Sequence, residues 1–375
     1  MINRSPSRST EAGLHYVVWQ SRPGGAESLI GHYVDAFGKS SKVHLYSLRD
    51  SPNEICDPAR VRFQRGHNRQ WPCYTEYFKY CRRHRDGLFH LINGGPVILL
   101  LTLLAGVRKP LYHIHGTIYW RRFWQKVTLK SAWLVASLFD VIYVANSQHS
   151  AAIFTRTVLR IHPRVIYNGF DVERYLAHRR MRSNLRRIGY AGRLVPAKNV
   201  DLLIRLFADV AETEADLELH IAGDGVLRAD LELQARESQF GDRIYFHGWV
   251  QDVADFFSSL DLLVFLSEYE SFGNVLAEAL LTGLPVLTSD IPAFREIHSN
   301  EEIFVLGDVE DHASLRRRFQ ESLAGFQELS AKAYDVSDYV KEVFDIRQHL
   351  RRIESLYDDI SSGTVLSHGG AEAVR

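Results

Sequence analysis

The sequence predicts an α/β protein built from two doubly wound halves, each with a mostly parallel sheet covered by helices. The chain has 375 residues, a length that suits two domains of ordinary size. Short apolar runs rich in Val, Ile and Tyr alternate with longer segments of helical period, as in βαβ units. The alternation stops at the polar, arginine-rich stretch 171–186 and then begins again, so this stretch is expected to be a solvated linker between the halves.

The expected elements follow from this alternation. In the first half, 1–170, the predicted strands are 14–20, 42–48, 88–93, 110–115, 141–147 and 164–169, and the predicted helices are 26–37, 74–85, 97–104, 120–138 and 147–157. In the second half, 187–343, the predicted strands are 187–192, 217–223, 243–248, 261–267, 284–289 and 302–306. Helices are predicted there at 200–211, 227–238, 253–260, 274–281, 313–323 and 329–339, followed by one at 346–360. The tail 362–375 has no sustained period and is expected to be loose.

The composition excludes several classes of protein. Lys and Arg total 45, as do Asp and Glu, so the chain lacks the excess charge of a nucleic-acid-binding protein. Three cysteines without a C-x-x-C pair do not suggest a disulfide framework and fit a reducing, cytoplasmic compartment. Residues 1–13 lack the apolar core of a secretory signal, and the most apolar run, 96–107, is too short to cross a bilayer.

The segment 267–289, SEYESFGNVLAEALLTGLPVLTS, carries the strongest sign of a ligand site. A strand ends there, a loop follows, and Gly273 would let the backbone approach a ligand at the start of a helix. The free N–H groups of Asn274 and Val275 would face an anion such as phosphate. Glu278 is then placed to accept hydrogen bonds from a sugar diol, and Glu270 could reach a second sugar. A solvated helix start with two surface glutamates is the competing interpretation.

A second loop supplies cations. Arg193 and Lys198 follow the first strand of the second half, in GYAGRLVPAKNVDLL. Fixed cations at the carboxyl end of a strand can hold a diphosphate and stabilise it as it leaves. Two other nucleotide-binding motifs are incomplete in this sequence. Tyr33 stands where a P-loop needs its first glycine, and Arg228 stands where a dinucleotide-binding fingerprint needs its last glycine.

These motifs together resemble family 4 of the retaining glycosyltransferases, which have the two-domain GT-B architecture. The resemblance rests on Glu270 and Glu278 spaced as E-x7-E, on Arg193 and Lys198, and on IAGDG (221–225), FHGWV (246–250) and GLPV (283–286). Looser matches in the first half are PGGAE (23–27), HIHGT (113–117), ANS (145–147) and VIYNGFD (165–171). The resemblance covers about residues 14 to 360, and 344–361 looks like the helix that returns to the first domain in this family.

The resemblance implies a role for each matching residue. Arg193 and Lys198 would bind the donor diphosphate, Glu278 the ribose, and Glu270 the donor sugar near its reacting face. The remaining donor-binding positions implied by the resemblance are Gly24 and Gly25 near the phosphates, Gly248, Trp249 and Val250 beside the base, and Phe272, Gly273, Asn274 and Val275 through their backbone amides. His115 matches a polar residue beside the scissile bond. No metal or other cofactor is implied.

Two features of the first half have open interpretations. His113 and His115 would share one face of a strand, so a metal site is conceivable there, although no third ligand stands at a suitable spacing. A structural role is favoured for His113, and a site role for His115, which precedes Gly116 at the carboxyl end of the strand. The segment Tyr119–Trp133 mixes aromatic and basic residues, so it fits an anionic membrane surface or a lipid-linked acceptor. A core-packed helix with a basic outer face is the alternative there.

The sequence therefore predicts a retaining, metal-independent hexosyltransferase that uses a UDP- or GDP-sugar and a glycan or lipid-linked acceptor. Its expected setting is polysaccharide, lipopolysaccharide or glycolipid biosynthesis in the cytoplasm, at the inner face of the cytoplasmic membrane. Two other classes stay open: a nucleotide-sugar epimerase on the same fold, which needs no acceptor, and a sugar-nucleotide-binding protein without activity.

Overall fold

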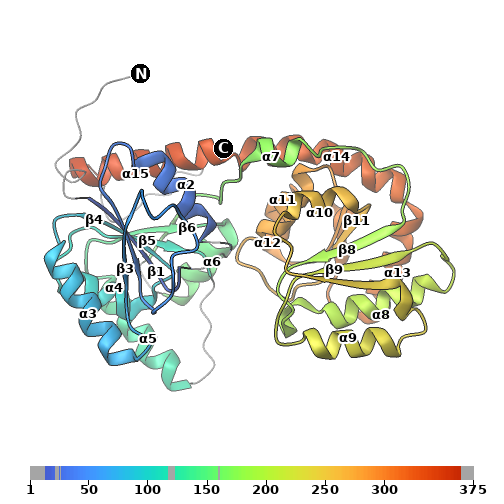
Figure 1. Ribbon diagram of the computed structural model, residues 1–375, viewed down its shortest axis with the longest axis horizontal. Helices are drawn as coiled ribbons and strands as arrows, with labels where there is room; N and C mark the ends of the chain where they lie inside the picture. The colour runs from blue at the N-terminus through green and yellow to red at the C-terminus, as the bar shows by residue number, and fades with distance from the viewer. Residues whose placement is uncertain (1–12, 22–24, 26, 117–122, 159–160, 365–375) are drawn as a thin grey trace. The chain divides into compact units, whose positions relative to one another are not determined.

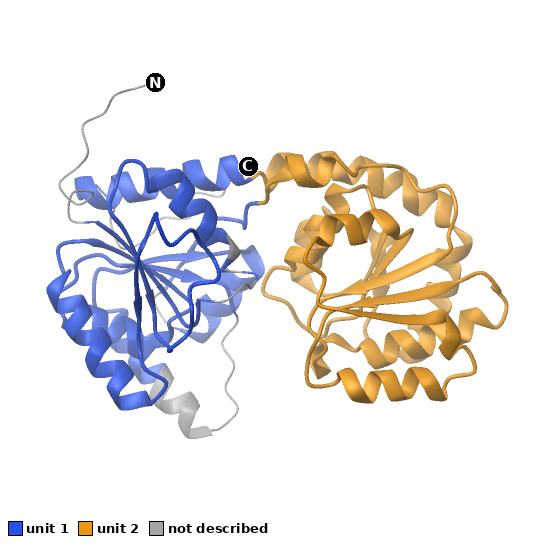
Figure 2. Cartoon of the chain, viewed as in Figure 1, with its two compact units in different colours: residues 1–169, 346–375 blue, residues 170–345 orange. Residues whose placement is uncertain are grey.

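The computed structural model describes residues 13–21, 25, 27–116, 123–158 and 161–364. These residues form two compact units, coloured separately in Figure 2. The first unit is Met1–Gly169 with Ile346–Arg375, and the second is Phe170–Asp345. The chain therefore leaves the first unit once and returns to it with its last helix.

In its described part, the first unit has a seven-stranded parallel sheet in the order β3-β2-β1-β4-β5-β6-β7. The strands are β1 Leu14–Val18, β2 Val43–Ser47, β3 Arg62–Arg65, β4 Leu88–Ile92, β5 Leu111–Ile114, β6 Ile142–Ala145 and β7 Arg164–Val165. The helices are α2 Ser28–Phe37, α3 Gln70–Arg83, α4 Gly95–Leu104, α5 Phe123–Ala136, α6 Gln148–Thr157 and α15 Ile346–Ser362. Because β1 is central, the chain winds first to one edge of the sheet and then to the other.

Two apolar cores cover the two faces of this sheet. One core joins the strands to α3, α4 and α5 through Tyr77, Leu99 and Trp133. The other joins them to α2 and α15 through residues such as Tyr33 and Ile353. Figure 1 shows α2 and α15 over one face and α3, α4 and α5 over the other. The return helix α15 is thus part of the first unit's core.

The described part of the second unit has a six-stranded parallel sheet in the order β10-β9-β8-β11-β12-β13. The strands are β8 Arg187–Ala191, β9 Glu218–Ala222, β10 Ile244–Gly248, β11 Leu262–Phe265, β12 Val286–Ser289 and β13 Val305–Gly307. The helices are α7 Val172–Leu176, α8 Val200–Ala211, α9 Arg228–Glu237, α10 Val253–Ser259, α11 Asn274–Leu281, α12 Pro292–Ile297, α13 His312–Ala324 and α14 Phe326–Val343. Figure 1 shows α10 and α11 on one side of this sheet and α8 and α9 on the other.

This architecture confirms the predicted fold class of two doubly wound, Rossmann-like units. The main differences are local. The edge strand β3 was not predicted, because its sequence RFQR is mostly exposed and has no apolar run. The predicted strand 164–169 is reduced to the two residues of β7, and the predicted strand 302–306 starts as a 3₁₀ turn, Glu302–Phe304.

The stretch 171–186 differs from a solvated linker. It contains α7, and Arg182 within it is only 1% exposed. The Arg182 guanidinium donates hydrogen bonds to the backbone carbonyls of Phe257 (3.2 Å), Thr282 (2.5 Å) and Arg180 (2.6 Å). The expectation that this basic run is solvated is therefore wrong for Arg182, which belongs to the interior of the second unit.

Candidate functional site

The candidate site lies at the carboxyl ends of β8 and β11 in the second unit. These strands are parallel neighbours, and the chain leaves β8 toward one side of the sheet and β11 toward the other. A point where the winding direction changes in this way is where ligands bind in open α/β sheets. The loops that follow β8 and β11 are the two loops that the sequence singled out.

Three contacts join these two loops. Lys198 ends the 3₁₀ turn Pro196–Lys198 after β8, and its Nζ forms an ion pair with Oε1 of Glu270, in the loop after β11. The amide of Glu268 donates to the carbonyl of Ala197 (3.0 Å), and Asn199 Nδ2 donates to the carbonyl of Leu266 (3.0 Å). The Lys198 and Glu270 side chains are only 11% and 21% exposed. The structure therefore brings together a cation and a carboxylate that lie 72 residues apart.

Arg193 lies earlier in the loop after β8. Its side chain is exposed, and its backbone carbonyl accepts a hydrogen bond from the Tyr190 hydroxyl (3.0 Å). The loop after β9 packs tightly on this one, since the amide of Leu194 donates to the carbonyl of Asp224 (2.9 Å). A Cβ at Gly223 would stand 1.8 Å from the carbonyl oxygen of Gly192, which explains why glycine is needed in the IAGDG segment. Arg193 is thus a surface cation on a firmly packed loop.

Helix α11 begins at the end of the Glu270 loop. Gly273 precedes it with φ 108°, a left-handed conformation that favours glycine, and a Cβ there would also meet Phe294 at 2.9 Å. Asn274 and Val275 are the first residues of the helix, and the helix dipole gives this end a partial positive charge. This helix start therefore favours an anionic ligand.

The Phe272 side chain does not take part in such a ligand site. It is 1% exposed and packs against Phe170 and Phe344, with ring centroids 6.2 Å and 5.4 Å away. The role proposed for Phe272 is therefore limited to its backbone. The buried ring anchors the loop that carries Glu270 to the body of the second unit.

Glu278 lies in α11, little more than one turn from its start, and faces α7. Burial raises the pKa of its carboxyl to about 7, and the neighbouring Arg174 and Tyr175 partly oppose this shift. Arg174 is itself paired with Asp252 at 2.9 Å. The sequence analysis did not identify Arg174 or Tyr175, because α7 was part of the expected linker and nothing local in it indicates a site.

The raised pKa predicts how stability depends on pH. The Glu278 carboxyl has a usual pKa of 4.5 and a folded-state pKa of about 7, so the folded state holds the proton more tightly. This contribution to stability is present below about pH 4.5 and is lost as the pH rises through 7. Between pH 5 and pH 8, the melting temperature of Glu278→Gln should therefore fall less than that of the wild type. The exposed Glu237→Gln serves as control, and equal losses in Glu278→Gln and wild type would contradict the assignment.

The segment Gly248–Val250 closes β10. Gly248 has φ 67°, and its carbonyl accepts a hydrogen bond from the amide of Gly223 (2.6 Å). The contact places this segment beside the loop after β9, which in turn packs on the Arg193 loop. Trp249 is 67% exposed, so its indole is free to stack on a planar ring.

The predicted site residues of the first unit are His115, Gly24 and Gly25. His115 follows β5 and is 8% exposed, and its backbone amide donates to Asn93 Oδ1 (2.9 Å). Burial, together with the nearby His349, lowers the pKa of His115 to about 3, so the imidazole is neutral at pH 7. Gly25 is an exposed turn residue, and Gly24 lies outside the described residues.

His113 belongs to a buried cluster of histidines. Its Nδ1 shares a hydrogen bond with Nε2 of His90 (3.2 Å), and its ring lies 4.0 Å from that of His115. His90 in turn contacts the Tyr357 hydroxyl of α15 (2.8 Å). These contacts agree with the structural interpretation of His113.

Of the segment Tyr119–Trp133, only residues 130–133 are described with their side chains. Trp133 is 3% exposed and packs edge-to-face on Tyr112 and Phe154, with centroids 5.0 Å and 4.8 Å away. Trp133 is therefore a core residue, as in the core-packed alternative, and Lys130 on the same helix is exposed. Residues 117–122 lie outside the described residues. None of the described helices is both long and apolar enough to span a bilayer.

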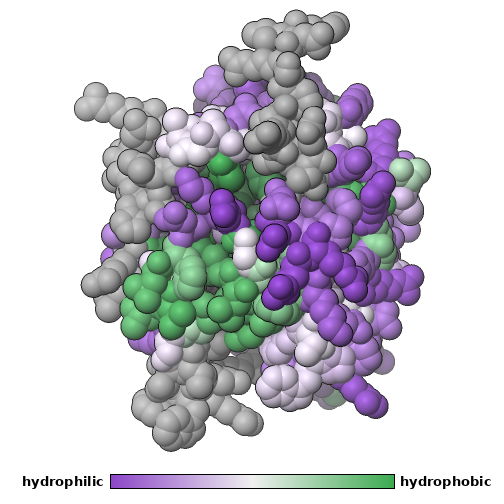
Figure 3. All heavy atoms as spheres, turned by 90° about the vertical axis from the view of Figure 1, so that its left-hand side faces the viewer, coloured by the Kyte–Doolittle hydropathy of each residue, from purple (hydrophilic) through white to green (hydrophobic). Residues whose placement is uncertain are grey.

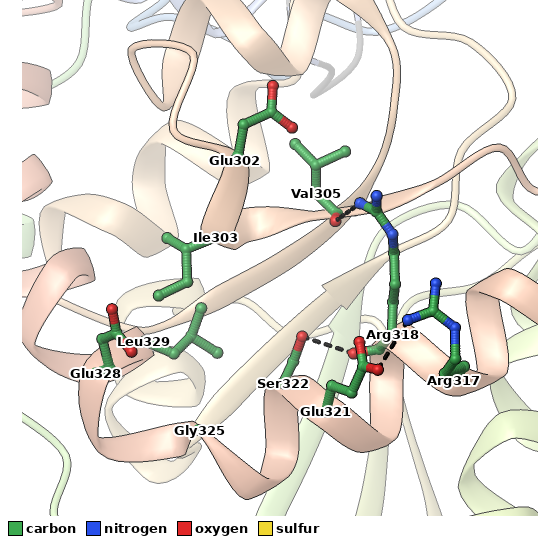
Figure 4. Close-up of a pocket in the computed structure, with 10 residues that line it drawn as sticks. All are labelled: Glu302, Ile303, Val305, Arg317, Arg318, Glu321, Ser322, Gly325, Glu328 and Leu329. Atoms are coloured by element: carbon green, nitrogen blue, oxygen red, sulfur yellow. Dashed lines mark hydrogen bonds and ion pairs between the residues drawn. The ribbon is translucent and has the colours of Figure 1, made fainter.

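A shallow pocket elsewhere in the second unit does not coincide with this site. Figure 4 shows it between the start of β13 and helix α13. Its polar groups bind one another, since Arg318 donates to the carbonyl of Val305 (3.2 Å) and Arg317 pairs with Glu321 (2.8 Å). None of the residues that the sequence singled out lines this pocket.

Comparison with known proteins shows what this chain is similar to. Residues 172–334 match the family model for glycosyl transferases group 1. The O-antigen biosynthesis glycosyltransferase WclY of Escherichia coli is 24% identical over 309 residues, which cover 76% of this chain and 82% of WclY. Among solved structures, Anabaena HepE in complex with UDP and glucose superposes with a TM-score of 0.75 at 20% identity, over 92% of this chain and 99% of HepE.

A second solved structure has the same fold. WaaG, a glycosyltransferase involved in lipopolysaccharide biosynthesis, gives a TM-score of 0.71 at 15% identity and covers 88% of this chain and 99% of WaaG. The likeness to HepE and WaaG shows the GT-B fold. The family match lies within the second unit, and the likeness to WclY extends over 309 residues.

Proposed function

We propose that this chain is a retaining glycosyltransferase that moves a hexose-type sugar from a UDP- or GDP-sugar to a hydroxyl group of a glycan or lipid-linked acceptor. The observation that carries the proposal is the meeting of Lys198, Glu270 and the start of α11 at the carboxyl edge of the second sheet. A cation, a carboxylate and a helix amino terminus within one pair of loops suit a sugar joined to a diphosphate.

Each group has a distinct task in this proposal. Lys198, Arg193 and the first amides of α11 bind the diphosphate, and they stabilise the negative charge that grows on it as the sugar leaves. Glu270 contacts the donor sugar, and Glu278 accepts hydrogen bonds from the ribose. Trp249 and its neighbours Gly248 and Val250 flank the base. For the first unit, we propose Gly24 and Gly25 as donor-binding residues and His115 as a catalytic residue.

The proposed reaction retains the configuration of the sugar. The bond between the anomeric carbon and the phosphate oxygen breaks, and a bond from the acceptor oxygen forms on the same face. The proton of the acceptor hydroxyl passes to the departing phosphate oxygen, so no protein base is required. Two cations and a helix dipole supply the positive charge that a metal ion would otherwise supply, which favours a metal-independent reaction.

The relatives support the substrate class. WclY acts in O-antigen biosynthesis, and the HepE structure contains UDP and glucose. A similar role here would place the chain in polysaccharide, lipopolysaccharide or glycolipid biosynthesis, in the cytoplasm at the inner face of its membrane. The free thiols of Cys56, Cys73 and Cys81 are consistent with a reducing compartment.

Calorimetric titration tests the metal-free donor site. UDP and GDP are titrated into the full chain with and without a chelator of divalent ions. We expect at least one of them to bind with the same affinity in both conditions, because protein cations and helix amides hold the diphosphate. Affinity that disappears with the chelator would contradict the metal-free scheme.

Product analysis with a radiolabelled donor then separates transfer from epimerisation, which changes the sugar without any acceptor.

A further inference from the structure

The loops that lead into the strands of the first unit form a second surface, away from the edge where His115 lies. All neighbouring strands of this sheet are parallel, so their amino ends meet at one edge and their carboxyl ends at the other. We call the first of these the amino-terminal edge. The segments that enter β4, β5 and β6 are 84–87, 105–110 and 137–141, and they are consecutive along it.

Apolar side chains are exposed where α4 and α5 end at this edge. Leu104, the last residue of α4, is 66% exposed, and Leu138, just after α5, is 69% exposed. Leu134, Val135 and Phe139 are 48%, 44% and 41% exposed. Leu134 lies in the last turn of α5 and Leu138 in the turn that follows it, and α4 packs against α5. We name these five residues the apolar end patch.

The patch is more than scattered exposure. Isolated exposed apolar residues are normal on a protein surface, whereas a contiguous group indicates an interaction site. Five of the twelve large hydrophobic side chains that are exposed in the described chain belong to this patch. Figure 3, which shows the side of the molecule that lies on the left in Figure 1, displays apolar atoms gathered in one area with hydrophilic groups beside it.

The segments beside the patch carry an excess of positive charge. Cations from the end of α3 and from the segments before β4 and β5 are Arg82, Arg83, Arg85, Arg108 and Lys109, against the carboxylates Asp86 and Asp140. The Arg85 side chain reaches the loop after α4, since its Cδ would lie 3.8 Å from a Cβ at Gly106. Within the described structure, Arg82, Arg83, Arg85 and Arg108 form no ion pair. The chain as a whole is neutral, so this excess is local.

We propose that the amino-terminal edge of the first unit docks on an anionic lipid bilayer. The apolar end patch would enter the headgroup region, and the arginines around it would meet lipid phosphates. An apolar group bordered by cations is the pattern of an interfacial anchor, in which burial and attraction to anionic lipid add. A second copy of this chain fits less well, because cations bordering a two-fold related patch would face one another. The proposal does not depend on the transferase activity.

Co-sedimentation of the full chain with vesicles tests the proposal. Vesicles that mix phosphatidylcholine with phosphatidylglycerol should bind the protein. Vesicles of phosphatidylcholine alone should bind it far less, and salt should release it. The double variant Leu134→Ser/Leu138→Ser should bind several-fold more weakly. Arg83→Ala and Arg108→Ala should each weaken binding about fivefold, since each basic residue near an anionic surface contributes about 1 kcal/mol.

Matched controls come from the second unit. Leu233→Ser removes an equally exposed leucine from α9, and Arg236→Ala removes an exposed arginine from the same helix. Both should bind vesicles like the wild type, and all variants should keep the wild-type melting temperature and UDP or GDP affinity. Unchanged vesicle binding by the leucine double variant would overturn the proposal. The proposal would also be overturned if the wild type is a dimer in solution and the leucine double variant is a monomer that still binds lipid equally well.

Discussion

Replacing Lys198 by Ala should lower the kcat of sugar transfer by about 10²–10³-fold, and it should raise the KM for the donor by a smaller factor. This is the scale expected when one preorganised charge-stabilising group is removed. The negative charge on the diphosphate grows as the sugar–oxygen bond breaks. An interaction that strengthens in the transition state lowers the barrier, whereas one that is equal in both states only tightens binding.

The position of Lys198 supports this expectation. Its ammonium is held by Glu270 and is largely covered, so it is already ordered before a donor arrives. Its loss also leaves the half-buried Glu270 without its cation, which repels a diphosphate. The variant Lys198→Arg should recover only part of the activity, because a planar guanidinium cannot take the place of a compact ammonium.

A matched control separates catalysis from stability. Lys332, which pairs with Glu301 at 2.8 Å in the same unit, has no role in the proposed site. Lys332→Ala should keep both kinetic constants. Steady-state kinetics on purified variants, with melting temperatures measured beside them, provide the comparison. A Lys198→Ala enzyme with near-normal kcat would remove the diphosphate role of Lys198.

The parts of the site that could be predicted are those that local sequence encodes. Helix α11 was predicted with its observed bounds, because Gly273 ends the loop and an apolar helical pattern follows. The loops of Lys198 and Glu270 could be placed at one edge, because parallel strands bring their carboxyl ends together. Neither argument needs to know which side chains touch.

The residues that were missed depend on distant partners. Tyr175 and Arg174 act on Glu278 only because α7 packs against α11. Trp133, in a segment of mixed aromatic and basic residues, is buried because Tyr112 and Phe154 surround it. Amphipathic patterning could not decide between the core and an interface for this helix, since both bury one apolar face.

Arg182 is the clearest case of this kind. In the sequence it is one of several arginines in a polar stretch, and such runs are usually solvated. In the structure its guanidinium lies among backbone carbonyls at the ends of two helices, Phe257 in α10 and Thr282 after α11. Helix carboxyl ends carry partial negative charge, so they can stabilise a buried cation in place of a carboxylate. Even so, burial lowers the pKa of Arg182 to about 10.

Replacing Arg182 by Met should therefore destabilise the protein by about 1.5–3 kcal/mol, the scale of a hydrogen bond to a charged group. Methionine fills part of the volume but donates no hydrogen bond, so these carbonyls lose a charged donor. Arg182→Lys should recover part of the loss, because an ammonium cannot reach several carbonyls with a planar fork. Chemical denaturation followed by circular dichroism measures the change.

The effect should also reach the proposed donor site, because Arg182 holds the carboxyl end of α11, and the amino end of this helix belongs to that site. Arg182→Met should weaken UDP or GDP binding under conditions where the variant is still folded, while Arg186→Met should change neither stability nor binding appreciably. Arg186 is a fair control, since it is exposed and pairs with Glu218 at the surface. If Arg182→Met is as stable as Arg186→Met, the buried guanidinium is not what joins α10 and α11. If Arg182→Met keeps its stability but binds the nucleotide more weakly, while Arg186→Met does not, the role of Arg182 is limited to positioning α11.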